Sequence, residues 1–124
     1  MSRNVLVVED ESMIAMLIED WLELQGYTVF VVPDVRHALD ALRDHPIDMA
    51  LLDVNLGGTP STPVAYELEA RGIPFTIATG YGAQGVDAAF RERGCLQKPF
   101  RISDLERAVK ELDRQVTALA GPAA

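Results

Sequence analysis

The chain has 124 residues, 48% of them apolar and 24% charged, which suits one globular domain with a single core. Its formal charge of −8 and its lack of a basic patch argue against binding to nucleic acid, and they favour protein surfaces of basic or mixed charge as partners. One cysteine cannot form an internal disulfide, and no apolar run approaches the roughly 20 residues of a membrane span, so we expect a cytoplasmic protein.

The first part of the chain alternates strands with helices. An apolar run predicts a strand over Asn4–Val8, and apolar residues at helical spacing predict a helix that ends at Gly26. The apolar face of this helix holds Ile14, Leu17, Ile18 and Trp21. Many β-branched and aromatic residues predict a second strand over Tyr27–Val32. A second helix begins after Asp34, whose side chain can cap it, and ends before Pro46.

The same alternation continues in the middle of the chain. Two further strands are predicted over Ile47–Asp53 and Ile73–Thr79. The helix between them has Pro63 near its first turn and Gly72 just past its end, as is common for helices. Residues 54–60 are rich in glycine and polar side chains and predict a loop.

The last part of the chain predicts a short helix over Gly85–Arg93, a strand over Cys95–Gln97 and a long final helix. Ser103 and Glu106 have the spacing of a capping box, so we expect the final helix to begin there. Strands that alternate with helices throughout predict an α/β fold, a doubly wound five-stranded parallel sheet with helices on both faces.

Polar residues stand at the carboxyl ends of four predicted strands. Glu9 and Asp10 follow the first strand, Asp53 ends the third, Thr79 ends the fourth and Lys98 follows the last. Parallel strands bring these ends to one edge of the sheet, where neighbouring carboxylates repel each other unless a cation such as magnesium is bound. We therefore predict a site for a divalent metal and a phosphoryl group. Asp53 would be the nucleophile, and Thr79 and Lys98 would contact phosphoryl oxygens.

With these motifs the chain resembles the receiver domains of bacterial two-component response regulators, over about residues 3–118. The motifs are Val8-Glu9-Asp10-Glu11, Leu51-Leu52-Asp53, Ala78-Thr79-Gly80 and Lys98-Pro99-Phe100. The resemblance implies a flavodoxin-like sheet of strand order 2-1-3-4-5, a cis bond between Lys98 and Pro99, and Asp53 as the phosphoacceptor. It also implies Mg²⁺ as the cofactor, held by Glu9, Asp10, Asp53 and the backbone carbonyl of Asn55.

The resemblance implies the partners as well. The phosphoryl donor would be a sensor histidine kinase or a phosphotransfer protein. The output would be contact with a downstream protein target, or removal of phosphate from a competing receiver, without nucleic acid or membrane. The chain would be a single receiver domain, residues 1–124, with no output domain. It would catalyse only its own phosphorylation and dephosphorylation, and so would not be a metabolic enzyme.

One stretch points to a subgroup of the family. Residues 74–82 resemble the "FATGUY" subgroup of single-domain receivers. Cys95 stands where most receivers have an aromatic residue, and Gly57-Gly58 stands where they have Pro-Gly. Cys95 is too small to follow the threonine inward on phosphorylation. We therefore expect the switch to use Gly80, Tyr81 and the segment after them.

Other interpretations of the same residues remain open. The chain could be a docking domain that keeps the receiver fold and works without phosphorylation. It could also be a phosphatase or phosphotransferase with an aspartyl intermediate. Those enzymes normally need a second acid two residues after the nucleophile, and Asn55 stands there instead. Glu9 and Asp10 could simply favour a helix N-terminus, and Cys95 could be a small buried core residue.

Overall fold

The computed structural model describes residues 3–80 and 94–119. Five parallel strands form its central sheet in the order β2-β1-β3-β6-β7, which confirms the predicted fold class and strand order. The strands of this sheet are β1 (Asn4–Val8), β2 (Thr28–Val32), β3 (Met49–Asp53), β6 (Phe75–Thr79) and β7 (Cys95–Gln97). The described helices are α1 (Ser12–Leu24), α2 (Val35–Asp44), α3 (Thr62–Ala70) and α4 (Ile102–Leu119). The helix predicted over Gly85–Arg93 lies outside the described residues.

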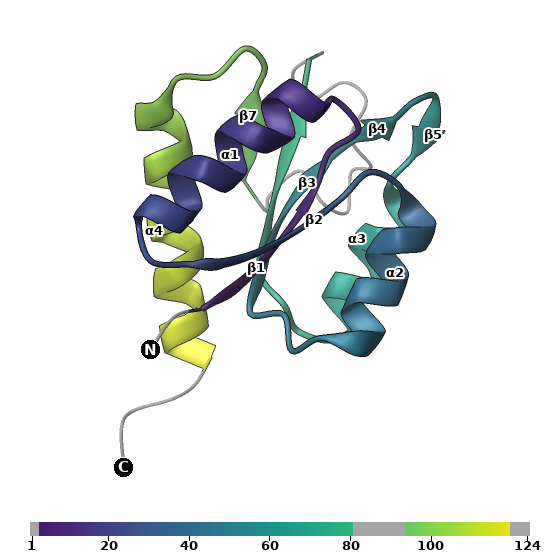
Figure 1. Cartoon of the computed structure of the whole chain (residues 1–124). Coiled ribbons are helices and arrows are strands. Elements are labelled where there is room, and N and C mark those ends of the chain that lie inside the picture. Colours follow the sequence, from purple (N-terminus) through teal and green to yellow (C-terminus); the bar gives the residue numbers. More distant parts are fainter. Residues whose placement is uncertain (1–2, 81–93, 120–124) are drawn as a thin grey trace.

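The helices cover the sheet on both faces (Figure 1). α1 and α4 pack on one face, where Leu22 and Leu112 join a core cluster with β1 and β3. α2 and α3 pack on the other face, where Leu42 and Leu68 join a second cluster. Every residue of β3 and β6 is buried, because central strands of a doubly wound sheet are covered on both sides. Among the described helices, none is long and apolar enough to cross a membrane.

Several element ends differ from the sequence prediction for local reasons. β6 begins at Phe75 rather than Ile73, since Pro74 has no N–H to donate and serves as an acceptor for Ala50 N at 3.1 Å. Asp34 caps α2 as predicted, accepting from His37 N at 2.8 Å. Leu17, predicted on the apolar face of its helix, is 48% exposed.

The predicted start of the final helix is wrong. α4 begins at Ile102, so Ser103 lies inside the helix instead of capping it. The backbone N–H of Arg101 donates to Asp104 Oδ2 at 2.9 Å, which is the reach-back half of a capping box placed two residues earlier than predicted. Glu106 instead pairs with Lys110 on the exposed face of the helix.

The segment after β3, predicted as a loop, contains a small antiparallel hairpin. Its strands are β4 (Asn55–Leu56) and β5 (Thr59–Pro60). Gly57 and Gly58, which connect them, have φ values of 62° and 92°. Positive φ at both positions is what a tight two-residue hairpin turn requires, and glycine adopts it without strain. In Figure 1 the hairpin lies at the top, above α2 and α3.

Candidate functional site

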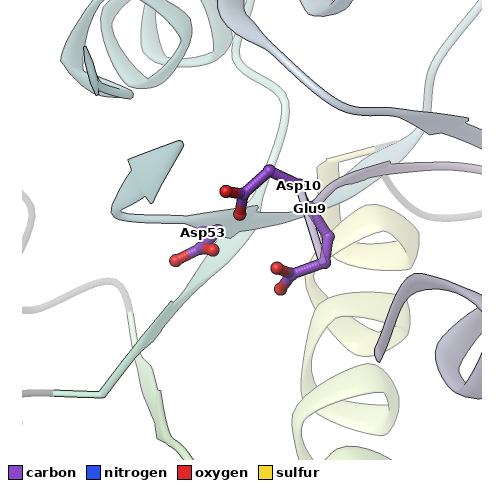
Figure 2. Close-up of side chains that lie close together, drawn as sticks. All are labelled: Glu9, Asp10 and Asp53. Carbon is purple, nitrogen blue, oxygen red and sulfur yellow. The ribbon is translucent and has the colours of Figure 1, made fainter. Parts of the chain in front are cut away.

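Three carboxylates converge at the carboxyl edge of the sheet (Figure 2). Glu9 and Asp10 come directly after β1, and Asp53 is the last residue of β3. One oxygen from each lies within 4.8 Å of the other two. Glu9 is 4% exposed and Asp53 is 7% exposed, whereas Asp10 faces solvent. Two acids this buried need a compensating charge.

Lys98 supplies that charge. Its Nζ donates to Glu9 Oε2 at 2.8 Å and to Asp53 Oδ2 at 3.1 Å. The backbone places the amine there, because Lys98 N donates to Thr79 O at 2.8 Å and so extends the β6–β7 pairing by one residue. The peptide bond between Lys98 and Pro99 is cis, as the family resemblance implied.

Burial and pairing set the protonation of this cluster. The pKa of Glu9 is raised from 4.5 to about 7, mainly because the carboxyl is buried. The hydrogen bond from Lys98 lowers this pKa, and the nearby charge of Asp53 raises it further. Burial alone would lower the pKa of Lys98. Its hydrogen bonds to Glu9 and Asp53 outweigh that effect and hold the pKa above its usual value. The amine therefore stays charged at neutral pH.

Backbone amides orient two of the acids. Glu11 N donates to Glu9 Oε1 at 3.1 Å, so this carboxylate is held from the helix side as well as by Lys98. Asn55 N lies 3.4 Å from Asp53 Oδ1, a long and weak hydrogen bond. Asp53 is therefore the less restrained of the two buried acids.

A cavity of about 550 Å³ opens over Asp53. Its lining is Asp10, Glu11, Asp53, Val54, Asn55, Gly57, Gly58, Pro60, Thr79, Gly80 and Lys98. Thr79 is 2% exposed and lies at the end of β6, beside the strand that carries Asp53. The cavity thus brings a carboxylate, a hydroxyl and an amine together in a space large enough for a phosphoryl group and water.

The oxygen donors of this cavity suit magnesium. Mg²⁺ prefers one or two carboxylates with carbonyl and water oxygens, and the cluster of Glu9, Asp10 and Asp53 provides hard oxygen donors. A Cβ at Gly57 would lie 3.7 Å from Asp10 Oδ2, which is an ordinary van der Waals contact, so the positive φ of 62° and not a lack of space favours glycine at this position. Asp10 and Asp53 would therefore offer carboxylate oxygens to a magnesium ion.

Most residues singled out from the sequence lie at the site. Glu9, Asp10, Asp53, Thr79 and Lys98 meet at one edge, and Asn55 and Gly80 line the cavity. Tyr81 lies outside the described residues. The prediction that Cys95 is buried is wrong, because it is exposed on the edge strand β7 and lines a separate pocket against α4. Partial burial raises the pKa of its thiol, which argues against a reactive thiolate.

The residues missed from the sequence belong to the hairpin. Gly57, Gly58 and Pro60 line the cavity, whereas the sequence predicts a loop in this segment and a site role for Asn55 alone. The adjacent glycines were a usable signal, because a glycine pair between two short polar and apolar segments favours a tight hairpin.

Comparison with known proteins finds many similar sequences and structures. The pattern of the response regulator receiver domain matches residues 5–110. The regulatory protein VanR of Enterococcus faecium is 30% identical over 125 residues, covering 98% of this chain but 54% of VanR. This chain therefore spans about half the length of VanR. The polar-differentiation response regulator DivK of Brucella ovis is 28% identical, covering 89% of this chain and 95% of DivK.

Solved structures give a higher identity. The solution structure of SdrG from Sphingomonas melonis Fr1 is 48% identical with a TM-score of 0.79, covering 90% of this chain and 96% of that one. A second structure, described as the BeF₃-activated conformation of SdrG, is 46% identical with a TM-score of 0.76 and covers 90% of this chain and 98% of that one.

Proposed function

This chain belongs to the response regulator receiver domain family, and we propose that it accepts a phosphoryl group on Asp53 in a Mg²⁺-dependent reaction. Members of this family are two-component signalling proteins and not conventional enzymes. The observation that carries the proposal is the position of Asp53: it is buried at a strand end, within 3.1 Å of the Lys98 amine and next to two further acids.

The chemistry follows from the side chains in the cavity. An Asp53 carboxylate oxygen attacks phosphorus in line with the leaving group, an acyl phosphate bond forms, and the bond between phosphorus and the donor nitrogen or oxygen breaks. A bound magnesium ion would neutralise the acids and the phosphoryl oxygens. Lys98 would transfer its hydrogen bonds from the acids to one phosphoryl oxygen, and the Thr79 hydroxyl would donate to another.

The metal would be held by the residues already described. Asp10 and Asp53 would bind it directly, Glu9 would bind through water, and the backbone carbonyl of Asn55 would complete the protein's share. The second SdrG structure supports a phosphoryl-accepting role, because a relative 46% identical to this chain takes a BeF₃-activated conformation.

The phosphoryl donor in this proposal is a sensor histidine kinase or a phosphotransfer protein, and a downstream protein receives the signal. The solvent face of α1 supports protein docking beside the site. Met13 is 84% exposed, Met16 is 59% exposed and Leu17 is 48% exposed, and they form one apolar stripe on a helix without basic residues. An apolar surface edged by basic residues would complement it.

We also propose that the chain acts as a stand-alone cytoplasmic receiver of the "FATGUY" subgroup. The match to DivK and SdrG over 95% and 96% of their own lengths supports a stand-alone receiver. The subgroup assignment rests on residues 74–82, of which 81 and 82 lie outside the described part of the chain. A docking module that works without phosphorylation is the alternative.

One experiment separates these two functions. The native protein and Asp53→Asn are incubated with acetyl phosphate and Mg²⁺, and intact mass is measured. We expect one added phosphoryl group on the native protein, none on the variant, and none when excess chelator is present. Equal labelling of both proteins would contradict the assignment of Asp53. A native protein that no donor labels would favour the phosphorylation-independent docking module.

A further inference from the structure

The hairpin β4–β5 forms one wall of the cavity, and hydrogen bonds and a buried leucine hold it in place. Asn55, Gly57, Gly58 and Pro60 all line the cavity. The segment is anchored at both ends: Val54 N donates to Ala78 O at 3.0 Å, and Ser61 N donates to Val54 O at 2.9 Å. Leu56 is 5% exposed and belongs to the core cluster on the α2–α3 face.

The pairing register decides which way the backbone of Asn55 faces. In an antiparallel ladder, hydrogen-bonded pairs alternate with pairs that make no bond to each other. Ser61 N bonds Val54 O, so the next pair, Asn55 and Pro60, is of the second kind. The backbone N–H and C=O groups of Asn55 therefore point out of the hairpin. An extended residue directs both groups to the same edge, and Asn55 N faces Asp53 Oδ1. The carbonyl of Asn55 is thereby directed toward the acids.

The side chain of Asn55 has a different task. Its Oδ1 accepts a hydrogen bond from Gly58 N at 2.7 Å, across the two-residue turn. Asn55 thus closes the turn with its side chain and faces the acids with its backbone. Asparagine suits this dual role, because its short amide reaches backbone N–H groups a few residues ahead.

We infer that the Asn55 side chain is a positioning residue, which braces the hairpin so that the carbonyl of the same residue is held ready for the cation. This inference rests on the proposed function. A pre-formed wall does not have to be ordered when the cation binds, so its ordering cost is not subtracted from affinity. The side chain acts only through the hairpin, and its removal deletes no metal ligand, because the backbone carbonyl remains in the chain.

The test compares Mg²⁺ affinity and amide exchange in matched variants of the full chain. Asn55→Ala removes the brace and keeps the backbone carbonyl. Losing one neutral hydrogen bond corresponds to a weakening of Mg²⁺ binding by about three- to tenfold, measured by calorimetric titration. Asn55→Ser, whose hydroxyl makes a weaker bond of the same type, should have a Mg²⁺ affinity between those of the native protein and Asn55→Ala. In metal-free protein, exchange at Gly58 N–H should accelerate in Asn55→Ala by a similar factor.

A second pair of variants separates positioning from general stability. Gly58 and Gly26 have φ values of 92° and 95°, and a Cβ at either would meet nothing within 4 Å. Gly58→Val and Gly26→Val therefore impose similar backbone strain, one in the hairpin and one at the far end of α1. Both should lower the melting temperature by similar amounts, and only Gly58→Val should weaken Mg²⁺ binding.

The outcomes are distinct. Unchanged Gly58 exchange in Asn55→Ala would show that the side chain braces nothing, whatever the metal does. Faster exchange with unchanged Mg²⁺ affinity would mean that the brace exists but does not position a ligand, and either result overturns the inference. If the native protein binds no Mg²⁺ while the exchange effect remains, the proposed function fails and the inference fails with it.

Discussion

Removing the Lys98 amine should markedly destabilise the protein in chelator, because this amine pairs with two buried carboxylates. Lys98→Met keeps most of the aliphatic side chain and removes the charge. The Lys98 side chain is 14% exposed, and its amine lies 2.8 Å from Glu9 and 3.1 Å from Asp53, whose side chains are 2% and 8% exposed. Removing one partner of a buried ion pair typically costs about 3–5 kcal/mol. Glu9 can relieve part of this by taking up a proton, so we expect a loss of about 2–4 kcal/mol.

The assay is unfolding by denaturant and by heat, in chelator at pH 8, where Glu9 is mostly ionised. A loss of this size lowers the melting temperature of a domain of this length by roughly 10 °C. At pH 6 the loss should shrink, since Glu9 is then protonated without help. Saturating Mg²⁺ should restore much of the stability, because at 100 times its dissociation constant a ligand of the native state adds about 2.7 kcal/mol.

Lys110→Met is the matched control. Lys110 also pairs with a carboxylate, Glu106 at 3.2 Å, but it is 74% exposed. Exposed pairs contribute roughly 0–1 kcal/mol, so this variant should differ from the native protein by less than about 0.5 kcal/mol. A Lys98→Met protein as stable as the control, in chelator at pH 8, would refute the reasoning that this amine neutralises the buried acids.

Three further predictions concern neighbouring residues. The pKa of Glu9 is about 7 in the folded protein and 4.5 ordinarily, so between pH 4.5 and 7 the folded state binds more protons than the unfolded state. The contribution of this carboxyl to the free energy of unfolding therefore falls as the pH rises through this range. Denaturant unfolding of metal-free protein should show this slope, and Glu9→Gln should abolish it. Asp10→Asn should raise the melting temperature in chelator, because it removes a charge that repels the neighbouring acids. The same variant should show a smaller rise in melting temperature when Mg²⁺ is added. A lower melting temperature than that of the native protein in chelator would contradict this prediction. Met16→Asp should slow phosphotransfer from the cognate histidine kinase about tenfold or more and leave labelling by acetyl phosphate unchanged. The control Leu24→Asp, at the other end of α1, should slow this phosphotransfer much less. Equal slowing by the two variants would argue against docking at Met16.

The sequence alone was sufficient to predict the fold and the set of polar residues at the strand ends. Hydrophobic periodicity identifies strands and helices locally, and parallel strands can meet their neighbours only with their carboxyl ends at one edge. Glu9, Asp53 and Lys98 could therefore be grouped although they lie far apart in the chain. Local hydrogen bonds altered individual boundaries, as at α4, where Asp104 reaches back to Arg101 and Ser103 does not act as the cap.

Tertiary structure decided which of these residues are buried and what they contact. The pairing of Lys98 with Glu9 as well as Asp53 depends on how β7 packs beside β6, which no local pattern encodes. The hairpin after β3 depends on Leu56 entering the core and on Asn55 closing the turn, so its residues looked like an ordinary loop in the sequence. The exposure of Cys95 follows from its place on an edge strand. Residue types determine which chemistry is available, whereas burial and pairing depend on contacts between distant segments that exist only in the folded chain.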